Sequence, residues 1–162
     1  MTVHVLCSIG WVGAVAAFLA LAVGAALSAG VFRSAMLVAA MVVTQAVIVP
    51  LALASTVSGV ASSLVSPWGL WRHYWVITKL ALTLAATGVL LLQVQPIAAL
   101  GSTHALAISS PGQPLVAEGH AGVASLLIHG TGGVVILIGI AILGIWKPRG
   151  ELRRRTTNAR SP

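Results

Sequence analysis

Four long runs of apolar residues, at about 4–28, 35–60, 74–95 and 121–146, constrain this chain more than any other feature of its sequence. As a helix, each run is long enough to cross the roughly 30 Å hydrocarbon core of a bilayer. The runs lack the alternation of apolar and polar residues that is typical of barrel strands. Because backbone polar groups in hydrocarbon must pair within the protein, we expect an all-α, polytopic transmembrane bundle of four helices.

The composition supports a membrane protein and excludes several soluble classes. Only 7% of the 162 residues are charged and 58% are hydrophobic, whereas charged residues make up about 25% of a typical soluble domain. This excludes a soluble enzyme and a disordered chain, and the single cysteine, Cys7, excludes an internal disulfide. The net charge of +7 does not indicate nucleic-acid binding, because no basic stripe lies on a soluble surface. We predict one transmembrane domain, residues 1–146, in the cell membrane.

Basic residues after the fourth run predict the orientation of the chain. Six of the nine basic residues lie in a tail at 147–162: Lys147, Arg149, Arg153, Arg154, Arg155 and Arg160. The positive-inside rule places this tail in the cytoplasm, and four spans then place the N-terminus there too. Arg33 falls outside, against the rule. The tail either sets the topology or also binds anionic lipid head groups. The first run is expected to be a retained helix rather than a signal peptide, because no basic residue precedes it.

Prolines and polar residues predict where the spans end or bend. Pro96 is expected to begin an external loop of about 25 residues that holds His104 and His120. Pro50 is expected to bend the second span. Near the middle of that span, Thr44 and Gln45 are expected to make hydrogen bonds between helices.

Lys79 is the most informative residue, because it lies roughly 6–8 Å inside the third run. Its ammonium group either snorkels to the interface or faces other helices. The second alternative is favoured by a stripe at every fourth position, Trp75, Lys79, Thr83 and Thr87. His4 begins the first run at a similar depth, so the two side chains are expected to meet across a helix pair or to ligate one shared group.

The fourth run contains a histidine beside several glycines. His129 lies about 12 Å into the run and is either a hydrogen-bonded core residue or a weak candidate for a metal ligand or proton relay. Gly130, Gly132 and Gly133 are expected to let a neighbouring helix approach closely. No carboxylate occurs within any run, which argues against a carboxylate proton relay. The sequence contains no P-loop, metalloprotease or haem-attachment motif. It therefore does not decide whether the protein is an enzyme.

Short segments, about a quarter of the chain, resemble known membrane proteins. The segment from His4 to Gly13, HVLCSIGWVG, resembles the first helix of the copper resistance protein D-like superfamily, which includes the bacterial membrane protoporphyrinogen oxidases. In that branch a histidine also precedes a tryptophan by seven positions, as His4 precedes Trp11. The spacing of four from Trp75 to Lys79 is similar to that of the same superfamily. The segments PWGLWRHYW and KPRG look closer still to uncharacterised actinobacterial membrane proteins.

The resemblance implies a helical fold and a haem b site. Its candidate axial ligands would be His4 and Lys79, with Trp11 and Trp75 packed beside the group. Three functions therefore stay open: a haem-binding or redox-linked membrane protein, a component that transports copper or another small solute, and a non-catalytic membrane scaffold or partner subunit. Because four spans are few for a transporter, the second function would also require a homo-oligomer.

Overall fold

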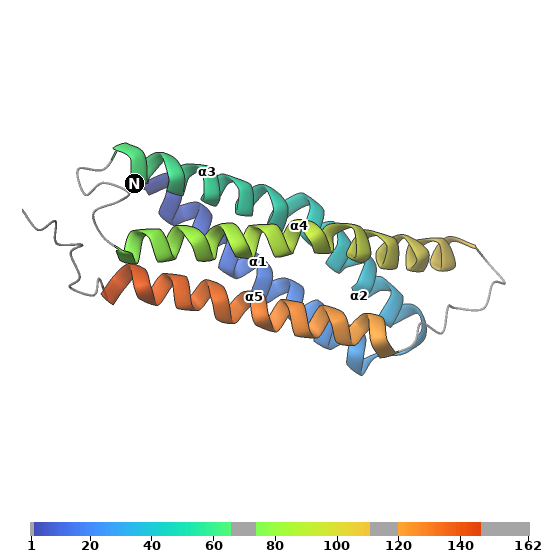
Figure 1. Cartoon of the computed structure of the whole chain (residues 1–162). Coiled ribbons are helices and arrows are strands. Elements are labelled where there is room, and N and C mark those ends of the chain that lie inside the picture. Colours follow the sequence, from blue (N-terminus) through green and yellow to red (C-terminus); the bar gives the residue numbers. More distant parts are fainter. Residues whose placement is uncertain (1, 66–73, 111–119, 147–162) are drawn as a thin grey trace, which may run out of the picture.

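The computed structural model describes residues 2–65, 74–110 and 120–146, and these residues form helices and no strand. The elements are α1 (Thr2–Leu27), α2 (Gly30–Val43), the π-helical turn η1 (Thr44–Ile48), α3 (Val49–Val65), α4 (Tyr74–Ser109) and α5 (His120–Trp146). α2, η1 and α3 follow one another without a break, so the chain makes four long helices (Figure 1). All four are long and apolar enough to cross a membrane. The prediction of an all-α bundle of four spans is confirmed.

The four long helices pack as a ring in which each has two neighbours. α1 contacts α5 and the continuous helix α2–η1–α3, and α4 contacts the same two neighbours. Within the described residues the backbone of α1 does not approach that of α4, and the backbone of α3 does not approach that of α5, so these are the diagonal pairs. The start of α1 and the end of α5 lie at the same end of the bundle (Figure 1). We call this the basal end and the opposite one the apical end. The predicted basic tail and residues 66–73 lie outside the described residues.

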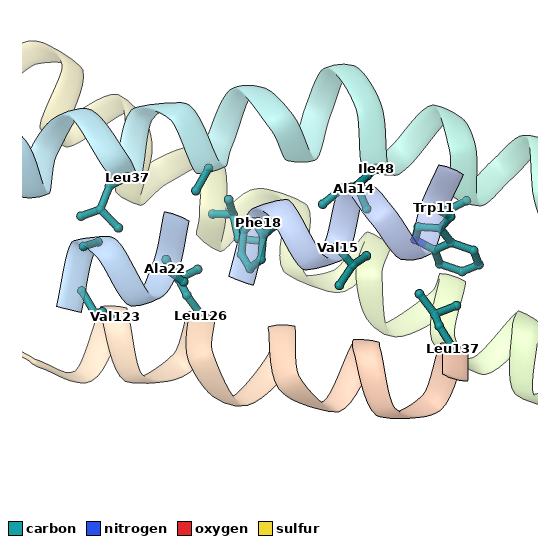
Figure 2. Close-up of a cluster of buried hydrophobic side chains, with 14 residues drawn as sticks. Trp11, Ala14, Val15, Phe18, Ala22, Leu37, Ile48, Val123, Leu126 and Leu137 are labelled. Atoms are coloured by element: carbon teal, nitrogen blue, oxygen red, sulfur yellow. The ribbon is translucent and has the colours of Figure 1, made fainter. Parts of the chain in front are cut away.

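α1 supplies the centre of the core. Its buried side chains recur at helical spacing, at Trp11, Ala14, Val15, Phe18, Ala22 and Ala25. Figure 2 shows this face of α1 between the α2–η1–α3 helix and α5. A Cβ atom added at Gly130 would lie 3.3 Å from the Phe18 ring, so the missing side chain lets α5 approach α1, as predicted. Gly132 differs, because a Cβ atom there would meet nothing within 4 Å.

The second span widens at η1, just before Pro50. In a regular helix, a proline ring clashes with the carbonyl group four residues earlier. Before Pro50 the hydrogen bonds change to the longer π spacing, in which the Val49 amide donates to the Thr44 carbonyl. Thr44 is buried and its hydroxyl donates to the Ala40 carbonyl of its own helix at 2.8 Å. Gln45 is exposed. The predicted bonds between helices from Thr44 and Gln45 are therefore absent from the described residues.

α4 does not end at Pro96, which corrects the prediction of a loop beginning there. Pro96 lies inside a helix that continues to Ser109. The proline removes one amide donor, whereas unwinding the helix in hydrocarbon would leave several backbone groups unpaired. The residues beyond it pack against α2: Gly101 lies against Met41, and His104 is only 1% exposed. His104 is thus a buried helical residue and not part of an external loop.

Candidate functional site

His4 holds the start of α1 against α3. Its Nδ1 lies 3.0 Å from the Ser55 carbonyl oxygen and 3.3 Å from the Ser58 hydroxyl oxygen. Because a carbonyl group only accepts, we assign Nδ1 as the protonated donor. The imidazole rests on Gly59, where an added Cβ atom would lie 3.0 Å from its Cε1. His4 is therefore half-buried in the α1–α3 contact.

Lys79 reaches the other side of the bundle. A Cβ atom added at Gly144 would lie 2.7 Å from the Lys79 Nζ, so the missing side chain at Gly144 makes room for the amine against α5. One turn along α4, Thr83 donates to the Lys79 carbonyl at 2.9 Å. A further turn along, the hydroxyls of Thr87 and Thr56 lie 2.9 Å apart and link α4 to α3. The predicted polar stripe thus faces neighbouring helices at Lys79 and Thr87.

The structure does not bring His4 and Lys79 together at one pocket. His4 is directed to α3 and Lys79 to α5, and these helices are a diagonal pair. Trp11 is 3% exposed and lies in the core, and the side chain of Trp75 lies outside the described residues. His4 and Lys79 are thus directed to different neighbouring helices, whereas the two axial ligands of the haem b that the resemblance implies would have to meet at one iron.

A cavity of about 350 Å³ lies between α1, η1, α4 and α5, and neither His4 nor Lys79 lines it. Its wall is mostly apolar, with Trp11, Val15 and Phe18 contributed by α1. Five of its lining residues have polar side chains: Thr44, Gln93, Thr103, Ser125 and His129. Several lining residues on α4 and α5, among them Val89 and His129, are also exposed. The cavity therefore opens sideways between α4 and α5, toward the bilayer.

His129 lines this cavity, and one of its ring nitrogens is an acceptor. Its Nδ1 lies 2.8 Å from the Ser125 carbonyl oxygen, which can only accept, so Nδ1 carries the proton. In the neutral imidazole Nε2 then has a free lone pair, and no other residue in the described ranges bonds it. This tautomer also suits a metal ligand. Within the described part of the chain, however, no group of three or more His, Cys, Asp or Glu side chains could hold a metal ion.

The other polar groups of the cavity include both acceptors and donors, the indole N–H of Trp11 among the donors. The Thr44 and Thr103 hydroxyls donate to carbonyls of their own helices, each at 2.8 Å. Thr44 is fully buried, whereas Thr103 is half-buried and its oxygen lone pairs remain available. Gln93 is half-buried, and its amide has no hydrogen-bond partner among the described residues. Sequence reasoning identified Trp11 and His129 but missed Gln93, because the third span was expected to end at residue 95. If the third span had been expected to continue past Pro96, the amide of Gln93 would have been recognised as a polar group near the centre of that helix.

Comparisons with known proteins add no relative. No protein-family model matches the chain, and no curated protein or solved structure is significantly similar to it.

Proposed function

We propose that this integral membrane protein binds a lipid-soluble small molecule bearing a hydroxyl group, in the cavity between α1, η1, α4 and α5. The observation that carries the proposal is the cavity itself, in which an apolar wall is combined with Gln93 and the free Nε2 of His129. A volume of about 350 Å³ falls within the range of about 300–1,000 Å³ that is typical of small-molecule sites.

The polarity of the cavity selects the chemical class. An apolar ligand enters sideways from the lipid, and its hydroxyl group finds few partners in hydrocarbon. His129 Nε2 and the Thr103 hydroxyl oxygen accept hydrogen bonds, and the Gln93 amide both donates and accepts. Alkyl hydroquinones and long-chain alcohols have this combination of an apolar body and a hydroxyl donor.

Trp11 provides a reporter for binding, since its indole is buried at the cavity wall. In a variant whose other four tryptophans are replaced by Phe, the emission of Trp11 is followed in liposomes during titration with a short-chain alkyl hydroquinone under argon. The dimethyl ether of the same molecule is the matched ligand control. We expect a saturable change with the hydroquinone and binding roughly tenfold weaker with the ether, which has lost its donors.

Two pairs of variants test whether binding depends on residues that line the cavity. Gln93→Leu and His129→Leu each remove a polar group of the cavity and are expected to weaken binding roughly tenfold. Gln95→Leu and His4→Leu are the matched controls, since neither residue lines the cavity, and they are expected to leave binding unchanged. Equal binding of the two ligands, or equal effects of Gln93→Leu and Gln95→Leu, would overturn the proposal.

A further inference from the structure

Two amide side chains, Gln45 on η1 and Gln95 on α4, are exposed on the outer surface of the bundle. Neither lines the central cavity, and neither amide has a hydrogen-bond partner among the residues that the structure describes. Each primary amide offers two N–H donors and a carbonyl acceptor. The helices that carry them are neighbours in the ring.

Contacts between helices place Gln45 near the middle of the bundle along its length. Gly10 of α1 lies beside Leu51, and Gly24 lies beside Met36. The centre of α1 is at residue 14 or 15. Interpolation between the two contacts sets Gln45 at about the same level along the bundle. The basal and apical ends of Thr2–Leu27 are then each about 20 Å away along the helix, too far for a glutamine side chain to reach water.

Gln95 lies at nearly the same depth. The Thr56–Thr87 hydrogen bond and the close approach of Met41 to Gly101 fix the register of the second span against α4. Interpolation between these two contacts sets Gln95 within about one helical turn of the level of Gln45. The bundle therefore exposes two amides to the hydrocarbon core at the same depth, on adjacent helices.

The outer face of α4 is suited to a helix partner. Leu84, Gly88, Leu91 and Gln95 recur at helical spacing, and all four are exposed. A Cβ atom added at Gly88 would meet nothing within 4 Å, so the backbone is open at that point. In the most apolar stretch of each described span, the fraction of buried residues is smallest in α4.

We infer that this face of α4 binds a second copy of the chain, with the Gln95 and Gln45 amides at the interface. Lipid tails cannot satisfy an amide, and polar side chains within spans usually face other helices. All copies cross the membrane in one orientation, so a two-fold axis along the membrane normal places Gln95 at the depth of its own equivalent. A primary amide is complementary to itself, since each one both donates and accepts. A copy of this chain therefore supplies the matching group at the required depth.

The test uses the full chain in liposomes, in a Cys7→Ala background without other cysteines. Gln95→Cys is treated with a short bifunctional maleimide, and Val135→Cys on α5 is the matched control, because Val135 is 63% exposed and close to the middle of its helix. We expect cross-linked dimers with Gln95→Cys at several times the yield obtained with Val135→Cys. Equal yields from the two positions would overturn the inference.

A second measurement removes the amides without adding thiols. In single-molecule photobleaching, Gln45→Leu combined with Gln95→Leu is expected to raise the dissociation constant of the dimer roughly tenfold. Both side chains are exposed, so the fold of each copy is expected to persist. An unchanged dissociation constant, or a wild-type chain that is monomeric at every density tested, contradicts the inference. Ligand binding in the cavity should not change in this variant, because neither glutamine lines the cavity. The measurement therefore tests the interface separately from the proposed function.

Discussion

The hydroxyl oxygen of Ser34 lies 2.9 Å from Nδ1 of His104, and this buried hydrogen bond joins α2 to α4 across 70 positions of the sequence. The same hydroxyl donates to the Gly30 carbonyl at 3.3 Å, so it accepts from Nδ1. Nε2 of His104 is then an acceptor, and this buried atom has no hydrogen-bond partner among the described residues. The bond fixes the register of the two helices near the apical end.

Removing the Ser34 hydroxyl should destabilise the bundle, because Ser34→Ala leaves both ring nitrogens of His104 unpaired. We expect a loss of about 1 kcal/mol in the free energy of unfolding, as for other hydrogen bonds between membrane helices. Combining Ser34→Ala with His104→Leu should cost less than the sum of the single changes. A double-mutant cycle in mixed detergent micelles measures this coupling, and strictly additive losses would show that the bond contributes nothing.

The close contact of α2 with α4 predicts that an alanine at Gly101 destabilises the bundle, whereas an alanine at Gly139 on α5 does not. A Cβ atom at Gly101 would lie 2.5 Å from the Met41 Cβ, and neither atom can rotate away. We expect Gly101→Ala to cost about 1–3 kcal/mol in unfolding free energy, as overpacked sites do. Gly139→Ala is the control, since its Cβ atom would meet nothing within 4 Å, and it should leave stability unchanged or slightly raised. Equal losses of stability in the two variants would show that α2 and α4 are not in close contact at Gly101.

Arg33, which the predicted orientation places outside and against the positive-inside rule, has a structural role at the turn after α1. Its Nε donates to the Ala25 carbonyl at 3.1 Å and to the Ser28 carbonyl at 3.0 Å. These bonds satisfy carbonyls at the end of α1 that lack a helical partner. Arg33→Met keeps the apolar stem but removes the donors, so we expect a loss of about 1 kcal/mol. Thermal unfolding in detergent measures it, and an unchanged midpoint would show that the bonds are not needed.

The placement of His4 and Lys79 predicts an optical result. Protein purified from haem-replete cells should show no Soret band that depends on both residues, because the structure directs them to α3 and α5. Spectra of His4→Ala and Lys79→Ala provide the comparison. A Soret band in the wild-type chain that shifts or disappears in both variants would instead show that the two residues share a haem.

The arrangement of spans could be predicted from the sequence because it depends on hydrophobicity alone. Length and apolar composition identified four helices, and the glycine at 130 correctly indicated close packing of α5 on α1. Pro96 was misjudged because proline ends helices in water, where an unwound backbone can bond to solvent. In hydrocarbon that alternative is lost, and α4 continues to Ser109.

The candidate site was less predictable, because depth along the chain does not determine which face of a helix a side chain occupies. His4 and Lys79 both lie at the basal end, but on diagonal helices and directed to different neighbours. The cavity combines Gln93 with His129 from helices whose register depends on tertiary packing. Gln45 lies in the π turn before Pro50 and is exposed, whereas the sequence predicted only a bend there.

Native mass spectrometry of the protein released from its own membranes tests the cavity most directly, when Ala86→Phe is compared with Ala85→Phe. Ala86 lines the cavity, whereas Ala85, the preceding residue, is exposed on the outside of α4. We expect a small apolar molecule with a hydroxyl group to remain bound to the wild-type and Ala85→Phe chains and to be absent from Ala86→Phe. A bound molecule retained equally by both variants, or no bound molecule in any of the three, would contradict the proposed binding function.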